Sequence, residues 1–202
     1  ESTGNYWKPV YNIFEEKGIP IMVVNAHFGG GGIKEALKNG ADIVLTQRVV
    51  DSALSLGPLA YEIDWDLNDP CQMAMGTTVG HIMEYSMHAT GGNYLDPGYK
   101  ECADPGHLGV PIAEFSEDEL IITKVPNTGG SVSRDSIIEQ IIYETTDPTD
   151  YMVPDVTLDL TNLKVEKIGK DVVRITGFKG HPRPEKLKIL VSFFEGYMNE
   201  EW

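Results

Sequence analysis

Cysteine, basic residues and long apolar runs are all scarce in this sequence of 202 residues. The two cysteines, Cys71 and Cys102, are too few for a disulfide framework or a structural zinc site. No basic and apolar signal segment opens the chain, and no apolar run approaches the roughly 18–20 residues of a membrane helix. We therefore expect a cytoplasmic protein without a membrane partner.

Acidic residues outnumber basic ones by almost two to one. Sixteen Lys and Arg stand against 31 Asp and Glu, which gives a net charge of −15. A surface of this charge repels nucleic-acid phosphates and anionic lipids, so we expect no nucleic-acid partner. A local basic site for a small anionic substrate remains compatible with the composition.

The first third of the sequence alternates strand-like and helix-like segments. Residues 6–17 have an amphipathic helical pattern, residues 19–25 and 41–46 are continuous apolar runs, and residues 33–39 and 51–62 read as helices. This order is typical of parallel strands joined by right-handed crossovers. We therefore predict an α/β fold with a Rossmann-like parallel sheet, flanked by helices, in which residues 19–25 form a central strand.

The rest of the chain combines one long helix with an antiparallel, β-rich end. A helix is predicted over residues 72–89, and the small residues of its first half, such as Gly76 and Gly80, permit close approach of another backbone. A loop follows at 93–109, then a hairpin at 111–115 and 120–124 and a helix at 135–144, for which Ser133 is a candidate cap. From residue 154 the pattern alternates as in antiparallel strands. We divide the chain into an α/β domain, residues 1–153, and a β-rich segment, residues 154–202.

Polar residues follow both predicted parallel strands, where ligands of open sheets bind. They are Asn25, Gly29, Gly30, Gly31, Gly32, Arg48 and Asp51. Glycine N–H groups at a helix start, together with a forked Arg48 cation, suit a phosphate or a carboxylate. The loop is not a Walker motif and matches the dinucleotide fingerprint only loosely. A tight turn, with Arg48 paired to Asp51 or Asp42, explains the pattern equally well.

Three titratable residues recur at helical spacing in the long predicted helix. His81, Glu84 and His88 share one stripe, because residues three and four apart are neighbours on a helix. We expect His81 and Glu84 to form an acid–base or orienting pair. A divalent metal held by His81, Glu84 and His88 is a weaker alternative, because spacing dictates no fourth ligand, and a solvated His–Glu pair is the third reading.

A second candidate anion site lies before the helix predicted at 135–144. It comprises Lys124, Thr128, Gly129, Gly130 and Ser131. Hydroxyls, a cation and N–H groups at a helix start can hold an anion, and a plain hairpin exit with a helix cap is an equal alternative. Cys71 reads as a small packing residue and not as a nucleophile, and the prolines around Arg183 fix an extended segment that presents its side chain rigidly.

Several short motifs are distributed along nearly the whole chain and are informative in combination. They include Asn25-Ala26, Gly40-Ala41-Asp42, Arg48, Asp51, Gly57-Pro58-Leu59, Gly80-His81, Glu84, Thr90-Gly91-Gly92, Asp96-Pro97-Gly98, Thr123-Lys124, Thr128-Gly129-Gly130, Asp147-Pro148, Pro154-Asp155 and Arg183-Pro184. In combination they resemble the acyclic terpene utilisation family AtuA. Two positions depart from the family pattern: Gln47 stands where glycine is usual, and His88 where histidine is not.

The resemblance implies a role in the breakdown of acyclic terpenoid or other branched carboxylic acids, whose intermediates in such pathways are coenzyme A thioesters. Relatives are usually longer, so it also implies that the α/β domain lacks its first strands and that the β-rich segment continues beyond residue 202. A homo-oligomer, or a complex with a small ferredoxin-like subunit, is the expected assembly.

We therefore expect an enzyme or enzyme subunit that acts on an acyl-CoA thioester or related carboxylate by lyase or hydratase chemistry. The predicted catalytic residues are His81, Glu84, Arg48 and Asp51, with the two glycine-rich segments holding anionic groups. The cofactor is left open, with a coenzyme A thioester as a candidate substrate. The alternative is a non-catalytic binding or scaffold subunit of a catabolic complex. A third reading is a metal hydrolase that uses His81, Glu84 and His88.

Overall fold

Three consecutive helices pack on one another in the computed structural model, which describes residues 16, 18, 20–116, 118–194 and 196–197. They are α2 (Gly31–Lys38), α3 (Ala53–Glu62) and α4 (Pro70–Met83). Helix α4 begins where it does because Asp69 caps it, accepting hydrogen bonds from the N–H groups of Cys71 at 2.8 Å and Gln72 at 3.3 Å. Every residue of α4 from Met73 to Ile82 is buried, so α4 is the central helix.

The small residues of α4 have the packing role that the sequence predicts. Helix α3 lies against α4, and a Cβ added at Gly80 would meet the backbone oxygen of Ser52, at the start of α3, at 2.3 Å. On its other side α4 contacts α5 (Arg134–Ile142), which Ser133 caps through a reciprocal capping box with Ser136. The candidate cap at Ser133 is thus confirmed.

A four-stranded antiparallel sheet covers α4 with the order β2-β3-β7-β6. Its strands are β2 (Pro111–Phe115), β3 (Glu119–Lys124), β6 (Lys164–Gly169) and β7 (Val172–Thr176). Alternation along β3 and β7 buries Leu120, Ile122, Val173 and Ile175 in one core cluster with α4 and α5. The predicted hairpin at 111–124 and the antiparallel pairing of residues 163–177 are therefore present.

A smaller antiparallel sheet, of β4 (Tyr151–Met152), β5 (Thr157–Leu158) and β8 (Gly180–His181), packs on the first half of α4. A second core cluster joins Val153, Val156 and Leu158 to Leu56 of α3 and Met73 of α4. Short 3₁₀ turns occur at η2 (Ser86–His88), η3 (Pro105–His107) and η4 (Leu160–Asn162). The division of the chain at residue 153 stays a prediction; residues on both sides of it share this second cluster.

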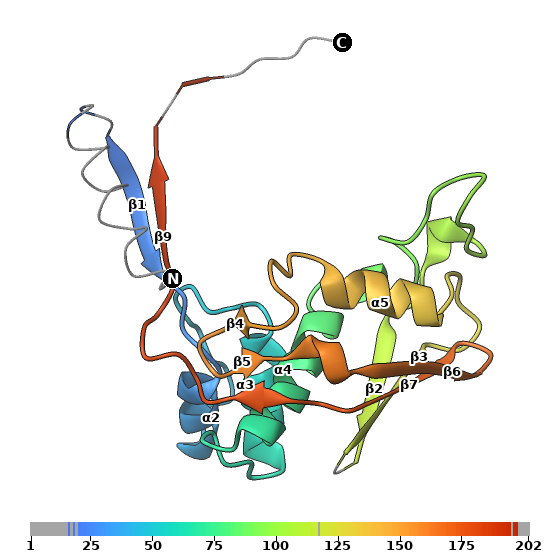
Figure 1. Ribbon diagram of the computed structural model, residues 1–202, viewed down its shortest axis with the longest axis horizontal. Helices are drawn as coiled ribbons and strands as arrows, with labels where there is room; N and C mark the ends of the chain where they lie inside the picture. Colours follow the sequence, from blue (N-terminus) through green and yellow to red (C-terminus); the bar gives the residue numbers. More distant parts are fainter. Residues whose placement is uncertain (1–15, 17, 19, 117, 195, 198–202) are drawn as a thin grey trace.

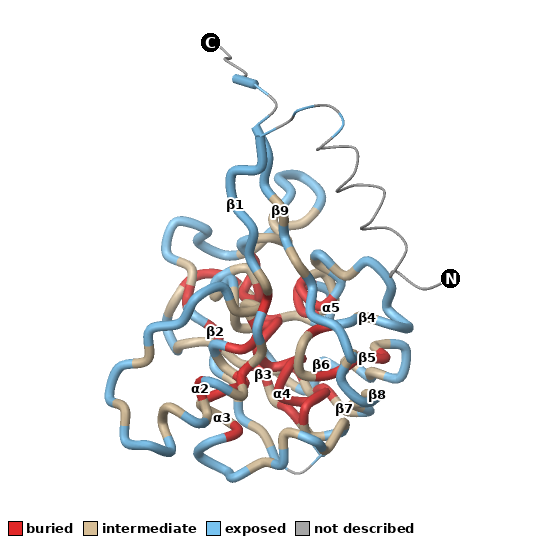
Figure 2. Tube along the Cα trace, turned by 90° about the vertical axis from the view of Figure 1, so that its left-hand side faces the viewer, coloured by how far each residue is buried: buried red, intermediate tan, exposed pale blue. Residues whose placement is uncertain are grey.

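A two-stranded ribbon of β1 (Ile21–Ala26) and β9 (Ile189–Phe193) projects from the body (Figure 1). The strands are antiparallel, and the tube of Figure 2 shows most of the ribbon in the colour of exposed residues. The predicted Rossmann-like parallel sheet is therefore wrong, and β1 is not a central strand. Every described sheet is antiparallel; parallel pairing is limited to isolated bridges such as Phe28 with Val49.

The second predicted parallel strand, residues 41–46, is not a strand. Ile43 and Leu45 are 89% and 97% exposed, because no described neighbour covers this apolar run. The helix predicted over 72–89 ends at Met83, and the helix predicted over 6–17 lies outside the described residues apart from residue 16. No helix in the described part of the chain is long and apolar enough to cross a membrane.

Candidate functional site

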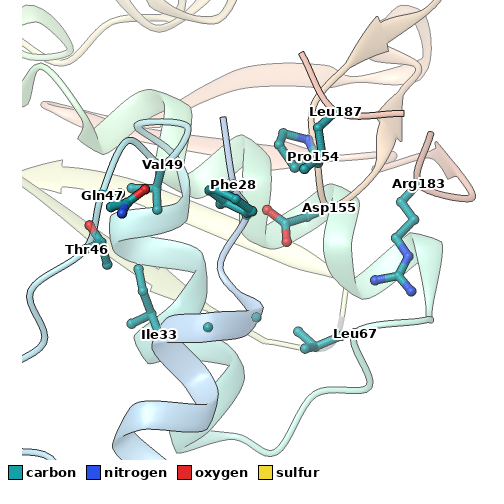
Figure 3. A pocket seen from close by; sticks show the side chains of 13 residues that line it. Phe28, Ile33, Thr46, Gln47, Val49, Leu67, Pro154, Asp155, Arg183 and Leu187 are labelled. Carbon is teal, nitrogen blue, oxygen red and sulfur yellow. The ribbon is translucent and has the colours of Figure 1, made fainter. Parts of the chain in front are cut away.

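A pocket of about 510 Å³ opens where the glycine loop before α2 meets the C-terminal part of the chain (Figure 3). We call it the glycine-loop pocket. Its walls are mostly apolar and its polar side chains are few. The lining residues are Phe28, Gly29, Gly31, Gly32, Ile33, Thr46, Gln47, Val49, Leu67, Pro154, Asp155, Arg183 and Leu187.

A tight turn between β4 and β5 delivers Asp155 to this pocket. The backbones of Val153 and Val156 exchange hydrogen bonds of 3.0 and 3.3 Å, which leaves Pro154 and Asp155 at the tip. Proline presets the first bend of such a turn, and a short polar residue suits its second position. The Asp155 carboxylate then accepts hydrogen bonds from the Gly30 N–H, at 3.0 Å to Oδ1 and 3.1 Å to Oδ2.

The glycine at position 29 is required by this contact. A Cβ at Gly29 would fall on the Asp155 carboxylate, whereas one at Gly32 would meet nothing within 4 Å. Asp155 lies at the N-terminal end of α2, where the helix dipole favours a negative charge. The N–H that we assigned to a ligand anion is thus already bonded to a carboxylate of the protein.

The environment of Asp155 raises the pKa of its carboxyl above the ordinary value. Burial raises the pKa of this carboxyl, while the Gly30 N–H and the nearby Arg183 guanidinium act in the opposite direction. Arg183 follows β8 and stands between Pro182 and Pro184, which hold the segment extended. In Figure 3, Gln47 lies at one end of the pocket and Arg183 at the other, with Asp155 between them.

The side chain of Arg48 bonds to His27, which lies two positions before the glycine loop. Its Nε donates a hydrogen bond to Nε2 of His27 at 3.2 Å. Burial lowers the pKa of His27, and the cations of Arg48 and Lys188 lower it further, against the effect of Asp51. A buried neutral imidazole that accepts from Arg48 is consistent with this charge pattern. The guanidinium of Arg48 is thus bonded to His27, and its role in holding an anion with the glycine loop stays a prediction.

His81 and Glu84 form the predicted pair. Their side chains are 7% and 6% exposed, and 3.1 Å separates Nδ1 of His81 from Oε1 of Glu84. Among the described residues, Nε2 of His81 is buried and has no hydrogen-bond partner. The ring of Tyr151 lies 5.9 Å from the His81 ring. Burial raises the pKa of Tyr151, as do the charges of Glu84, Glu144 and Asp51.

Asp51 acts electrostatically on two groups of residues. Its charge raises the pKa of His27, the partner of Arg48, and the pKa of Tyr151, whose ring lies beside that of His81. Of the four residues predicted to be catalytic, Arg48 bonds to His27, His81 and Glu84 contact each other, and Asp51 acts electrostatically on His27 and Tyr151. None of them lines the glycine-loop pocket.

His88 is separate from the His81–Glu84 pair, because α4 ends before it and the helical spacing is lost. It lies in η2, stacked on Tyr85 with ring centroids 4.9 Å apart. The described residues contain no group of three or more His, Cys, Asp or Glu side chains arranged to hold a metal ion. A metal site at His81, Glu84 and His88 therefore has no geometric support.

The second predicted anion site is occupied by the protein's own bonds. The N–H groups of Gly129 and Ser131 donate to the carbonyls of His107 and Thr90, each at 2.8 Å, and the N–H of Gly130 donates to Ala103. Nζ of Lys124 donates to the carbonyl of Thr128 at 2.7 Å. This segment ties neighbouring loops together, and its role as an anion site stays a prediction.

A family model described as "Acyclic terpene utilisation family protein AtuA" matches residues 6–202, which is nearly the whole chain. The chain belongs to the AtuA family. No curated protein and no solved structure matches it. Membership confirms the resemblance in the sequence and places this AtuA chain in acyclic terpene utilisation.

The sequence argument missed the two charged residues of the pocket in this AtuA chain. Asp155 entered only as part of a family motif, and Arg183 only as a rigidly presented side chain, because each lies far along the chain from the glycine loop. The detectable signal is local: Pro154-Asp155 between two apolar segments is a turn signature, and a turn delivers its acidic residue to whatever it packs on. Asn25 lies in β1, paired with Leu190, and Cys71 is exposed, so it is not a packing residue.

Proposed function

We propose that this AtuA-family protein is an enzyme, or the substrate-binding part of one, that acts on an acyclic branched acyl compound by acid–base addition or elimination. The observation that supports this most is the chemistry of the glycine-loop pocket. Apolar walls suit a branched hydrocarbon chain, and Asp155 and Arg183 supply a proton carrier and a cation within the same space.

The size of the pocket agrees with a substrate of this kind. A volume of about 510 Å³ lies within the usual range of about 300–1,000 Å³ for small-molecule sites. Phe28 and Leu187 are 47% and 43% exposed at its edge, so burial of an apolar chain would remove their surface from water.

The proposed reaction is hydration of a double bond conjugated with a carbonyl, or the reverse. Asp155 as carboxylate takes a proton from water, the hydroxide adds to the β-carbon, and the electrons move to the carbonyl oxygen as an enolate. Protonation of the α-carbon by the Asp155 carboxyl completes the addition, so that substrate and water give one product without an oxidant. Arg183 stabilises the enolate charge, which exists only along the reaction and not in the substrate.

The proposal transfers the acid–base role from His81 and Glu84 to Asp155. His81 and Glu84 do not line the pocket, and a general acid must come within hydrogen-bond reach of the atom it protonates. The buried His81–Glu84 pair supports Tyr151 and, through α4, the adjoining small sheet. Its substitution should therefore affect stability more than chemistry.

The second candidate function is a non-catalytic binding or scaffold subunit. The position of Arg48, His81 and Glu84 outside the pocket lining favours it, because an active site built on those residues would place them in the cleft that holds the substrate. In that case a partner subunit carries the reaction, and the pocket only holds the ligand.

Turnover by the purified protein separates these candidates. The assay incubates an unsaturated acyclic monoterpenoid thioester with the protein in ¹⁸O-labelled water and follows labelled hydroxyl product by mass spectrometry. We expect product with wild type and with His81→Gln, and a loss of about 10²-fold or more with Asp155→Asn, the usual effect of removing a general acid–base group. Tight binding without product would support the scaffold candidate, and a loss limited to His81→Gln would return the chemistry to α4.

A further inference from the structure

The charges that line the glycine-loop pocket cancel. Of its 13 lining residues, only Asp155 and Arg183 carry a formal charge, and their signs are opposite. The other polar side chains, Thr46 and Gln47, are neutral. The formal charges of the lining residues therefore sum to zero for a ligand that enters this pocket.

The backbone N–H of Gly30, next to the start of α2, is already bonded to a carboxylate of the protein. The Gly30 N–H at the start of α2 donates to both oxygens of Asp155, so a ligand carboxylate would have to displace this side chain or lie beside it. Two carboxylates at one place repel each other, and one of them must bind a proton for both to stay.

Two further cations, Arg48 and Lys188, are sequence neighbours of lining residues. Arg48 is engaged with His27, and Lys188 acts on the same histidine, where Asp51 opposes both. The chain as a whole carries a net charge of −15, which disfavours an incoming anion. Among the 13 lining residues Arg183 is the only cation, and its charge lowers the pKa of Asp155.

We infer that the glycine-loop pocket selects an uncharged head group on an acyclic apolar chain, such as an ester or thioester, and discriminates against the free carboxylate through Asp155. This inference rests on the proposed function, in which the pocket is the substrate site. The wall supplies donors for an uncharged carbonyl oxygen at Arg183 and Gln47, which lie at opposite ends of the space (Figure 3). A neutral carbonyl also leaves Arg183 free for the charge that develops during reaction.

Calorimetric titration with two matched ligands tests the inference: an acyclic monoterpenoid carboxylic acid and its methyl ester, each at pH 7 with the full chain. Wild type should bind the ester with a Kd about tenfold lower than that of the acid. Asp155→Asn leaves the pocket with a net positive charge and keeps an oxygen that can accept from Gly30. It should raise affinity for the acid about tenfold and change affinity for the ester by less than about twofold.

Asp171→Asn is the matched control. The Asp171 carboxylate also accepts a backbone hydrogen bond, from Val132 at 3.0 Å, but it does not line the pocket, so this variant should keep the wild-type ratio of affinities. Arg183→Gln provides a second route if Asp155→Asn fails to fold. Removal of the cation should widen the preference for the ester.

The outcomes separate the inference from the proposed function. Tighter binding of the acid than of the ester by wild type, or an unchanged ratio in Asp155→Asn, would overturn the inference and leave the pocket as the substrate site. Binding of neither ligand would overturn the proposed function and the inference together.

Discussion

Replacing Gly80 with alanine tests the close packing of helix α4 on the start of helix α3, next to His81. The added Cβ would lie 2.3 Å from the backbone oxygen of Ser52, 2.7 Å from its Cα and 2.9 Å from its carbonyl carbon. Ordinary contact begins near 3.4 Å, so the shortfall is 3.4 − 2.3 = 1.1 Å. These atoms belong to the first turn of α3 and cannot rotate away as a side chain could, so α3 must move from α4.

The magnitude follows from two opposing effects. Overpacking of a close contact costs about 1–3 kcal/mol, and the better helix propensity of alanine returns up to about 1 kcal/mol. We expect a net loss of roughly 1–2 kcal/mol, and a domain of this size loses about 2–4 °C in Tm for each kcal/mol. Thermal and urea unfolding followed by circular dichroism measures this loss.

Gly32→Ala is the matched control for Gly80→Ala. The same methyl group is added to a helix, α2, but nothing lies within 4 Å of it, so only the propensity gain of up to about 1 kcal/mol remains. The two variants should therefore change stability with opposite signs. If Gly80→Ala were as stable as wild type, the close packing of α3 on α4 would be wrong.

Three further predictions concern the pocket and the second glycine-rich segment. The pKa of the Asp155 carboxyl is raised above its ordinary value of 3.8 in the folded protein. The folded state therefore binds this proton more tightly than the unfolded state, and the stability that the proton contributes is lost as pH rises from 3.8 through the raised pKa. Asp155→Asn should flatten this part of the curve of unfolding free energy against pH, and an unchanged slope in urea titrations would refute the assigned environment. Gln47→Ala should enlarge the pocket and favour ligands with a longer branch, by about fourfold for each methylene newly buried, in calorimetric titration. Lys124→Met should remove the bond to Thr128 and lower stability by about 1 kcal/mol without changing ligand affinity; weaker ligand binding would restore this segment as an anion site.

Local structure in this chain follows from local sequence. The Ser133 cap and the hairpin of residues 111–124 each depend on residues a few positions apart, and both are found as predicted. The pairing partner of β1 cannot be predicted from local sequence. A continuous apolar run predicts a covered strand, but it does not indicate which strand pairs with it or in which direction. Its antiparallel partner is β9, near the opposite end of the chain.

The same distinction applies to the candidate sites. His81 and Glu84 were predicted as a pair because three residues on a helix bring side chains together whatever surrounds them, and they are in contact. The contact of Asp155 with Gly30 spans 125 positions, and no periodic pattern contains it. Arg48 was assigned to the glycine loop because of the expected parallel sheet; with that sheet absent, its partner is His27.

The most direct test of the account is photo-crosslinking with an acyclic branched ester that carries a diazirine, followed by mapping of the labelled peptides by mass spectrometry. If the glycine-loop pocket is the substrate site, the label should appear in residues 28–33, 46–49 or 154–155 and disappear when unlabelled ester competes. Competed labelling around His81 and Tyr151, with none at the glycine loop, would contradict the account and place the site on α4.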